Sequence, residues 1–491
     1  MQLEQYFSQF RDDIIGIDQT FESPYGVQKI VYADWTASGR LFRPIEDFLC
    51  QKVGPFVANT HTETNLTGST MTIAYKEARK IIKRHVHADE TDILISSNSG
   101  MTGVVNKLQR IIGIKLHEKF KQHFQIPLEE KPIIFVTHME HHSNQTSWIE
   151  TIGDVMVIPN DDNGLIDLDG FRKLVNNYSE RKIKIAAITS CSNVTGISTP
   201  YHDIAKIMHQ HGGYCFVDFA CSAPYIDINM HPDDPEMYLD AIYFSPHKFL
   251  GGPASSGILI FNQKLYNNKI PDNPGGGTVD WTNPWGEHKY HDAIEEREDG
   301  GTPSFIQTIR VALCIKLKEK MGVNNILERE HEILDRVWPK LKAIPNLKVL
   351  ADQHENRLAV ISFYIEGLHF NLAVRLLNDR YGIQVRGGCS CAGTYGHYLL
   401  KVSQEQSKLL TDEISMGVFC NKPGWIRMSF HPTNTDAEID YVLKAIREVS
   451  ENHKAWSDDY LYRLETNEYV HKHNGSKAVD IQNWFNNFLE L

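Results

Sequence analysis

Between about residues 90 and 262 the chain alternates short apolar runs with amphipathic, helix-like stretches. The apolar runs lie at 92–97, 132–138, 155–159, 184–189, 214–219, 241–245 and 257–261. Runs of this length that are rich in β-branched and aromatic residues are typical of buried strands. Strands that are separated by helices form largely parallel sheets with helices on both faces. The sequence therefore predicts an α/β fold over this part of the chain.

The pattern changes after residue 300. Two long amphipathic stretches predict helices at 304–321 and 324–344. Strand-like runs at 358–365, 382–388 and 424–430 then alternate with helix-like runs at 371–382 and 435–453. This mixture predicts a smaller α+β domain. We expect an N-terminal segment over 1–30 that packs on the small domain, a large domain over 31–322, the small domain over 323–453 and a C-terminal extension over 454–491.

The charge and composition disfavour several classes of protein. The chain has 491 residues and a formal net charge of −12, which argues against nucleic acid or an anionic membrane as a main partner. No apolar run approaches the length that spans a bilayer, and residues 1–15 lack the basic and apolar parts of a signal peptide. The eight cysteines are irregularly spaced, unlike a disulfide framework. We expect a cytoplasmic protein with reduced thiols.

The stretch 240–253 carries the strongest chemical signal. A buried strand-like run is followed by Ser-Pro-His-Lys at 245–248 and then by a Gly-Gly-Pro turn. Lys248 is therefore expected on a tight connection at a strand end, where partial desolvation lowers the pKa of the amine and makes it nucleophilic. Ser245 and His247 add donors that suit an anionic cofactor. The alternative is an ordinary surface lysine in a loop.

The segment 245–253 resembles the Schiff-base segment of the class V, fold type I pyridoxal-phosphate enzymes. This aminotransferase family includes the cysteine desulfurases and selenocysteine lyases. The resemblance implies a large cofactor-binding domain with a seven-stranded, mostly parallel sheet flanked by helices. It also implies that Lys248 holds pyridoxal 5′-phosphate, with Ser245 and His247 beside it. Further motifs of such a site follow in order over residues 30–450.

A glycine-containing turn at 99–103 follows a predicted strand and opens a predicted helix. Backbone amides at a helix start, a glycine and a hydroxyl can together bind a phosphate. The resemblance assigns the cofactor phosphate to Gly100, Met101 and Thr102. Met101 stands where the family usually has a threonine, so it offers only its backbone amide. The alternative is a plain strand–helix turn.

A histidine-rich segment follows the second predicted strand. His141 matches the family's histidine that stacks on the cofactor ring, and such a ring can also transfer protons. The alternative is a zinc site formed by His138, His141 and His142 with Cys389 and Cys391. Adjacent histidines point apart on an extended or helical segment, which disfavours the metal, and we expect none.

Two polar residues at predicted strand ends match the family's contacts to the ring. Asn193 would bond the phenolic oxygen, and Asp218 would hold a proton on the pyridine nitrogen. A buried carboxylate is costly without such a cation, and the bound proton keeps the ring an electron sink. Cys221 stands where desulfurases often have a glutamine that also reaches the phenolic oxygen. The alternatives are an ordinary Asn-Gly turn and a helix-capping aspartate.

The loop 298–304 resembles a Gly-Thr-Pro segment that reaches the cofactor phosphate of the other subunit in these dimers. Thr302 would then bind a cofactor that its own chain does not hold, and the active unit would be a homodimer. A loop followed by a helix start is the alternative.

The stretch 385–393 bears most directly on the reaction. Cys391 lies at the family's offset from Arg386, on a glycine-rich loop where a thiol near an arginine would be nucleophilic. Cys389 is an additional thiol that can resolve oxidised states or bind metal. The alternative for Cys391 is an inert cysteine in a loop. Arg427 matches the arginine that holds the substrate α-carboxylate, a role suited to bidentate geometry, unless it forms a structural salt bridge.

These motifs predict a pyridoxal-phosphate enzyme that acts on an amino acid as its small-molecule substrate, most directly a cysteine desulfurase or selenocysteine lyase. Such an enzyme releases alanine and carries a persulfide on Cys391 for a possible sulfur-acceptor protein. The nearest alternative is a class V aminotransferase, epimerase or lyase without sulfur transfer. A non-catalytic binding protein of the same fold is another.

Overall fold

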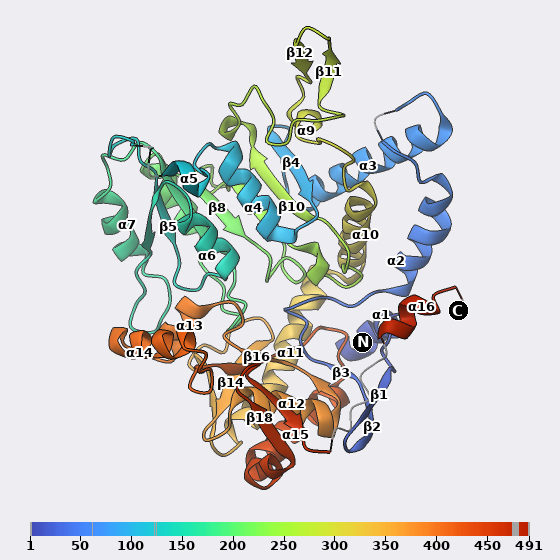
Figure 1. Cartoon of the computed structure of the whole chain (residues 1–491), viewed down its shortest axis with the longest axis vertical. Helices are drawn as coiled ribbons and strands as arrows, with labels where there is room; N and C mark the ends of the chain where they lie inside the picture. Colours follow the sequence, from blue (N-terminus) through green and yellow to red (C-terminus); the bar gives the residue numbers. More distant parts are fainter. Residues whose placement is uncertain (1, 61, 122, 124, 474–480, 490–491) are drawn as a thin grey trace.

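A seven-stranded sheet forms the centre of the larger part of the molecule (Figure 1). The structure is a computed structural model that describes all residues except 1, 61, 122, 124, 474–480 and 490–491. Across the sheet the strands are β4 (Asp92–Ser97), β10 (Gly257–Asn262), β9 (Ala241–Phe244), β8 (Tyr214–Asp218), β7 (Lys184–Thr189), β5 (Ile133–Val136) and β6 (Asp154–Val157). β10 runs antiparallel to both its neighbours, and the other pairs are parallel. The predicted mostly parallel sheet is confirmed.

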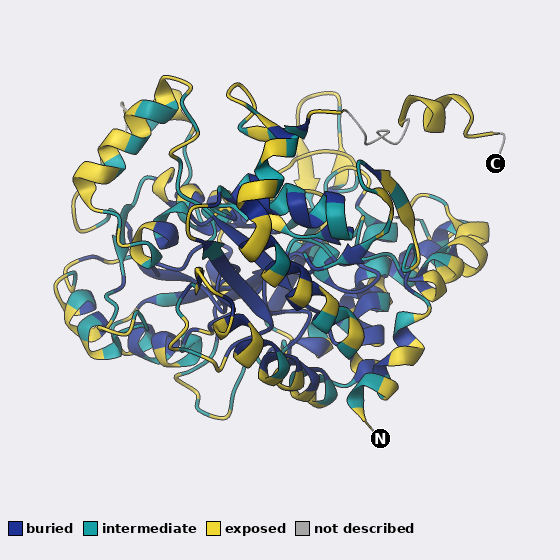
Figure 2. Cartoon of the chain, turned by 90° about the horizontal axis from the view of Figure 1, so that it is seen from below, coloured by how far each residue is buried: buried dark blue, intermediate teal, exposed yellow. Residues whose placement is uncertain are grey.

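Both faces of this sheet are covered by helices, because alternate residues of each strand enter two separate hydrophobic clusters. In β8, Phe216 packs in one cluster and Val217 in the other. The Phe216 face is covered by α4 (Gly100–Ile111) and α6 (His142–Ile149). The Val217 face is covered by α3 (Leu66–His85), α7 (Leu168–Asn176), α8 (Tyr201–Gln210) and α10 (Phe305–Met321). Figure 2 shows the buried strands beneath helices whose outer faces are exposed.

A smaller antiparallel sheet lies at the other end of the molecule (Figure 1). Its strands, in spatial order, are β13 (Leu347–Val349), β14 (Val360–Ile365), β17 (Trp425–Ser429) and β16 (Arg386–Gly388). The helices that pack on it are α11 (Val323–Lys342), α12 (Phe370–Tyr381) and α15 (Asp436–Trp456). Beside it, β3 (Val31–Tyr32) pairs in parallel with β15 (Ile383–Gln384), so residues 31–32 join this part of the fold.

The N-terminal helix α1 (Leu3–Arg11) contacts both parts of the molecule. Phe7 and Phe10 pack in the cluster under the large sheet, whereas Arg11 pairs with Glu438 at the start of α15. The hairpin of β1 (Thr20–Ser23) and β2 (Gly26–Lys29) follows, and Tyr25 in its turn bonds Asp459.

Short elements complete the chain. The C-terminal hairpin of β18 (Tyr460–Arg463) and β19 (Glu468–His471) contacts α12, and Tyr460 donates a hydrogen bond to the buried Asp379. Trp484 and Phe485 of α16 (Ile481–Asn486) are exposed. The remaining elements are α2 (Arg43–Phe48), the π-helical η1 (Leu49–Val53), η2 (Gly54–Phe56), α5 (Glu118–Lys121), η3 (Pro246–Lys248), η4 (Gln263–Leu265), β11 (Val279–Thr282), β12 (His288–Tyr290), α9 (Ile294–Arg297), α13 (Gly393–Leu399), α14 (Gln404–Ser415) and η5 (Ser457–Asp459).

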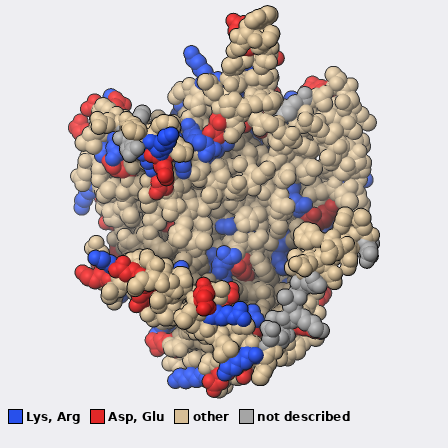
Figure 3. Space-filling view, viewed as in Figure 1, with Lys and Arg blue, Asp and Glu red and all other residues tan. Residues whose placement is uncertain are grey.

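Acidic and basic side chains occur in small mixed groups on the face shown in Figure 3, and most of that face carries neither. Within the described ranges, every helix is too short or too polar to pass through a membrane.

Candidate active site

A cavity of about 380 Å³ lies where the carboxyl ends of β8 and β9 and the start of α4 meet the strands β16 and β17. Its volume falls in the range of about 300–1,000 Å³ that small-molecule sites occupy. The position also fits the general rule that ligands bind at the carboxyl ends of parallel strands. The predicted site residues that line it are Gly100, Met101, Thr102, His141, Asn193, Asp218, Cys221, Ser245, His247, Lys248, Arg386, Cys391 and Arg427.

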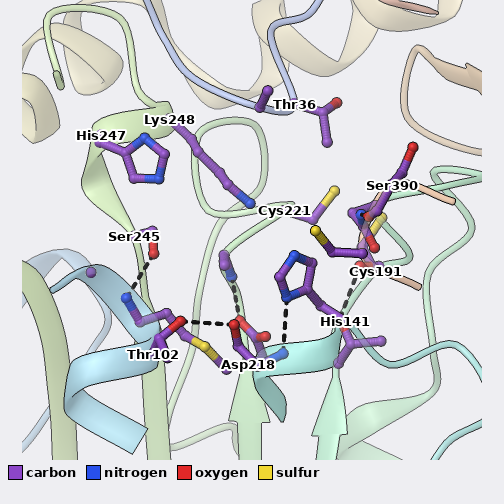
Figure 4. Close-up of a pocket in the computed structure, with 18 of the residues that line it drawn as sticks. Thr36, Thr102, His141, Cys191, Asp218, Cys221, Ser245, His247, Lys248 and Ser390 are labelled. Atoms are coloured by element: carbon purple, nitrogen blue, oxygen red, sulfur yellow. Dashed lines mark hydrogen bonds between the residues drawn. The ribbon is translucent and has the colours of Figure 1, made fainter. Parts of the chain in front are cut away.

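Lys248 ends the short helix η3, which follows β9 directly. Its side chain reaches into the cavity toward Cys221 and His141 (Figure 4). Burial lowers the pKa of the Lys248 ammonium, which increases the fraction of free amine available as a nucleophile. The neighbouring His247 ring is neutral at pH 7, because burial and the nearby Lys248 lower its pKa to about 4.

Asp218 is the last residue of β8 and is buried. Its Oδ1 accepts a hydrogen bond of 2.8 Å from the backbone N–H of Ala220. Burial raises the pKa of Asp218 to about 6, although that hydrogen bond and Lys248 act in the opposite direction. A carboxylate held in this way strongly favours a cationic partner in the cavity.

The start of α4 forms the polar end of the cavity opposite the arginines. Gly100 has a left-handed φ of +59°, which turns the chain from β4 into the helix. The backbone N–H of Met101 donates to Ser245 Oγ at 2.8 Å, and Thr102 Oγ1 lies 2.7 Å from Ser143 Oγ. Backbone amides at a helix start and three hydroxyls thus gather at one place, as an anion site requires.

His141 is the residue before α6, and its Nδ1 accepts the backbone N–H of Ser143 at 3.1 Å. Burial and the nearby Lys248 lower the pKa of His141 to about 3, so the ring is neutral. The next histidine serves a different purpose, because His142 Nε2 accepts the backbone N–H of Gly393 at 2.9 Å. Among the described residues, His138, His141 and His142 do not converge with Cys389 and Cys391 into a metal-ligand group.

Asn193 lines the same cavity from the loop after β7. One amide N–H donates to the backbone oxygen of Ser390 at 2.7 Å, and the buried Oδ1 has no hydrogen-bond partner among the described residues. Cys221 is buried nearby, and its thiol lies 3.6 Å from the backbone oxygen of Ser192. A hydrogen bond from Cys191 lowers the pKa of Cys221.

Two arginines form the small-sheet side of the cavity. Arg386 and Arg427 are directly opposite each other on the antiparallel strands β16 and β17. Asp34 bridges them, with Oδ1 at 2.8 Å from Arg427 Nη2 and Oδ2 at 3.2 Å from Arg386 Nε. The side chain of Arg427 is only 3% exposed, whereas that of Arg386 is 47% exposed.

Cys391 is exposed on the loop between β16 and α13 and lines the cavity. Ser390 and Cys391 both have left-handed φ values, of +50° and +57°, which are strained for residues with side chains. The backbone of His142 fixes this turn, because its N–H donates to the Cys391 oxygen at 2.7 Å. Cys389 is partly buried and packs in a hydrophobic cluster with Tyr395.

Thr302 does not line the cavity of its own chain. It is exposed and lies just before α10, after Gly301. The expected contact of Thr302 with a second subunit therefore stays a prediction.

Several residues of the cavity wall are not among the predicted site residues. Thr36, Ser143, Thr189, Cys191 and Ser390 all line it. Ser143 and Ser390 lie within two residues of His141 and Cys391, so the same motifs carried a signal for them. Thr36 lies in the small-residue turn 34–39 that follows an apolar run, so this motif also carried a signal, whereas Thr189 is the last residue of β7 and has no distinctive pattern.

The donors and acceptors of this cavity fit pyridoxal 5′-phosphate. The buried Asp218 carboxylate would meet the pyridine nitrogen, and the Lys248 amine would meet the aldehyde. Asn193 would face the phenolic oxygen and donate to it through its amide nitrogen, one N–H of which already bonds the Ser390 oxygen. The start of α4 with Ser245 would take the phosphate.

Residues 31–442 match the model of the family described as aminotransferase class-V. Probable cysteine desulfurases of Halalkalibacterium halodurans and Staphylococcus aureus are 27% and 26% identical to this chain. Each match covers 86% of this chain and 93% of the relative.

Solved structures show the same fold. A cysteine desulfurase of Thermococcus onnurineus superimposes with a TM-score of 0.72 at 23% identity, covering 90% of this chain and 98% of that one. The cysteine desulfurase CsdA of Escherichia coli superimposes with a TM-score of 0.68 at 21% identity, covering 91% and 98%. Fold type I is therefore confirmed for this chain.

Proposed function

The chain belongs to the aminotransferase class-V family of pyridoxal-phosphate enzymes, and from this membership we propose that it is a cysteine desulfurase or selenocysteine lyase. The observation that carries the proposal is the position of Cys391. Its exposed thiol lines the same cavity as the Lys248 amine, the Asp218 carboxylate and Arg427. Transamination needs no nucleophilic thiol at this place, whereas transfer of sulfur from an amino acid to an enzyme persulfide requires one.

The large domain would hold the cofactor. Lys248 would bind its aldehyde covalently, Asp218 would keep a proton on its ring nitrogen and the neutral His141 ring would stack on it. Gly100, Met101, Thr102, Ser245 and His247 surround the place proposed for its phosphate. When bound, pyridoxal phosphate supplies an electron sink for negative charge at the substrate α-carbon.

The protein's own residues would then orient the substrate and move its protons. Arg427, with Arg386, would bind the substrate carboxylate, since a guanidinium matches a carboxylate in a bidentate way. The amine of Lys248, whose pKa is lowered by burial, would take the α-proton at Nζ. The Nδ1 atom of the neutral His141 ring accepts the Ser143 N–H, so the ring would carry its hydrogen on Nε2 and present it to the substrate or cofactor.

Cys391 would carry out the sulfur transfer. Its thiolate attacks the sulfur of substrate cysteine, the bond between that sulfur and the β-carbon breaks, and a persulfide forms on Cys391. The electron pair of the broken bond stays with the β-carbon, which takes a proton and becomes the methyl group of alanine. Because Cys391 is exposed, a thiol of an acceptor protein can reach the outer sulfur.

Assembly and location are further parts of the proposal. We propose a homodimer in which Thr302 of each subunit reaches the phosphate in the other, because Thr302 is exposed and outside its own cavity. A cytoplasmic location is supported by the eight cysteines, all of which are free thiols.

Removal of the Cys391 thiol tests the proposal. The pyridoxal-phosphate form of the protein should release alanine and sulfide from L-cysteine with a reductant, and Cys391→Ala should lower that rate at least 100-fold. Cofactor absorbance should be unchanged, because Cys391 is proposed to act on sulfur and not on the cofactor.

The matched control is Cys420→Ser, which removes another exposed thiol outside the cavity. This variant should keep the wild-type rate. Full activity in Cys391→Ala would contradict the desulfurase proposal and favour a class V enzyme without sulfur transfer.

A further inference from the structure

Two cysteines in the cavity wall take no part in the reaction proposed above. Cys191 and Cys221 both line the cavity (Figure 4), and they are only 1% and 4% exposed. The two thiols are hydrogen-bonded to each other. Their sulfur atoms also lie 3.8 Å and 3.6 Å from the same backbone oxygen, that of Ser192. Two thiols in such contact are candidates for a disulfide, whose sulfur atoms must approach to about 2.05 Å.

The framework of the large sheet holds these two thiols together. Cys191 comes just after β7 and Cys221 just after β8, and the two strands are adjacent and parallel. Beyond the strands the two loops remain joined. The backbone N–H of Ser190 donates to the Asp218 oxygen at 2.9 Å, and Ser190 Oγ lies 2.6 Å from Ser222 Oγ. The pairing of the cysteines is therefore a fixed property of the fold.

Cys221 is the more reactive of the two thiols. The hydrogen bond from Cys191 lowers the pKa of Cys221 and raises the pKa of Cys191. Burial opposes the effect on Cys221, whereas the nearby cations Lys248 and Arg427 add to it. The thiolate is the form of cysteine that reacts with oxidants. A small oxidant that enters the cavity therefore meets a reactive sulfur with a second thiol beside it.

We infer that Cys191 and Cys221 form an oxidation site, at which a peroxide joins the two thiols into a disulfide while the cavity is free of cofactor. With hydrogen peroxide, the Cys221 sulfur attacks one oxygen, the O–O bond breaks, and Cys221 becomes a sulfenic acid. The hydroxide that leaves takes up the thiol proton and becomes water. The Cys191 sulfur then attacks the Cys221 sulfur, the S–O bond breaks, and a second water leaves. The two thiols lose two electrons, which the peroxide gains.

The disulfide would disturb two residues that are proposed to hold the cofactor, and this part of the inference rests on the proposed function. Asn193 lies on the same loop as Cys191. Ala220, the neighbour of Cys221, donates its N–H to the Asp218 carboxylate at 2.8 Å. Both loops must move when the sulfur atoms come from hydrogen-bond contact to bond length. The bridged protein should therefore bind pyridoxal phosphate more weakly, and bound cofactor should keep peroxide away from the thiols.

The first test treats cofactor-free wild-type protein with hydrogen peroxide. Mass spectrometry of the digested protein then measures the peptides that are joined through Cys191 and Cys221. This link should be the main disulfide, and dithiothreitol should reverse it. Saturating pyridoxal phosphate should slow its formation at least tenfold. Absence of the link, or the same rate with and without pyridoxal phosphate, would overturn the inference.

The second test titrates the cofactor absorbance. Bridged wild-type protein should bind pyridoxal phosphate at least tenfold more weakly than reduced protein, and dithiothreitol should restore the affinity to within about twofold. The double variant Cys191→Ala/Cys221→Ala cannot form the link, so peroxide should leave its own affinity unchanged. Equal affinity of the bridged and reduced proteins, or the same loss after peroxide in the double variant, would overturn the inference.

The matched control is Cys215→Ala, which removes a buried thiol of β8 that does not line the cavity. This variant should form the link at the wild-type rate. None of these measurements depends on sulfur release. A protein that forms the link and binds pyridoxal phosphate but frees no sulfide from cysteine would contradict the proposed function alone. Sulfide release by a protein that never forms the link would contradict this inference alone.

Discussion

At the scale of single residues, Asp218 shows how the site is built at the expense of stability. Its carboxyl group has an ordinary pKa of 3.8, which burial raises to about 6 in the folded chain. At pH 7 the group is ionised in both folded and unfolded chains, so the folded, cofactor-free protein bears the full cost of the buried charge. As the pH falls through 6, the folded chain takes up a proton first and the cost is relieved.

Asp218→Asn should therefore stabilise the cofactor-free protein. A shift of about two pKa units corresponds to roughly 3 kcal/mol, which is the largest gain expected at pH 7. The gain should be smaller at pH 5, where wild-type Asp218 is already mostly protonated in the folded state. Denaturant unfolding of both proteins at the two pH values measures this difference.

The same variant should hold pyridoxal phosphate at least tenfold more weakly, since an amide cannot pair with a protonated ring nitrogen. Titration of the cofactor absorbance gives this value. A stability difference that is equal at pH 5 and pH 7, or a loss of stability in Asp218→Asn, would contradict the assigned cause.

Lys248 and Asp218 could be predicted from the sequence because each lies at or just after the end of an apolar run, and their local surroundings decide their chemistry. Asp34 could not be assigned a partner in this way. Its contacts with Arg386 and Arg427 join residues 352 and 393 positions apart, and such a distance leaves no periodic signal. Similarly, Glu140 appeared only as part of a histidine motif. In the fold its buried carboxylate accepts hydrogen bonds from Thr137 and Thr189 at the ends of β5 and β7.

At the scale of elements, the turn 34–39 after β3 packs directly on the lysine-bearing helix η3 and the residue that follows it. The backbone N–H of Gly39 donates to the oxygen of His247 at 2.9 Å. A Cβ atom on Gly39 would lie 1.9 Å from the backbone oxygen of Phe249, far inside van der Waals contact. Only a glycine allows the two segments to approach so closely.

Gly39→Ala should therefore displace Lys248 and destabilise the protein. We expect a loss of about 3 kcal/mol in unfolding free energy, at the upper end of the cost of overpacking, and slower covalent binding of pyridoxal phosphate. Chemical denaturation and the rate of cofactor absorbance change measure the two effects.

Gly54→Ala is the control, because its new Cβ would meet a backbone oxygen at an ordinary 3.4 Å. This variant should behave as wild type in both measurements. An unaffected Gly39→Ala would mean that the turn 34–39 can move away from the lysine segment at little cost.

The strands of the large sheet could be predicted as elements because each is a short apolar run. The direction of β10 could not, since the apolar run 257–261 is equally compatible with either orientation. The place of the aromatic tail was also unpredictable. The hairpin β18–β19 packs through Tyr460 on Asp379, a contact between two segments that share no local pattern.

At the scale of the whole molecule, the position of Thr302 predicts that active sites are shared between subunits. Lys248→Ala should be inactive, and Thr302→Ala should bind pyridoxal phosphate at least tenfold more weakly. Co-expression of the two variants should give heterodimers with one wild-type site each. That site takes Lys248 from one chain and Thr302 from the other.

Cofactor titration and sulfide release of the purified heterodimer measure the recovery. The control is the homodimer of Lys248→Ala, which has no intact site. The shared site would be contradicted if a verified heterodimer recovered neither cofactor binding nor sulfide release. A monomeric wild-type protein in analytical ultracentrifugation would contradict it as well.

The ion pair between Asp34 and Arg427 also has a consequence for how the protein is made. On the ribosome, Asp34 emerges early, and its partner follows only after nearly 400 further residues have been translated. The wall that we propose for the substrate carboxylate is thus missing until Arg427 is made, even when the large sheet has already left the exit tunnel. A nascent chain can begin to fold around its lysine, but the proposed site is completed only after Arg427 has been translated.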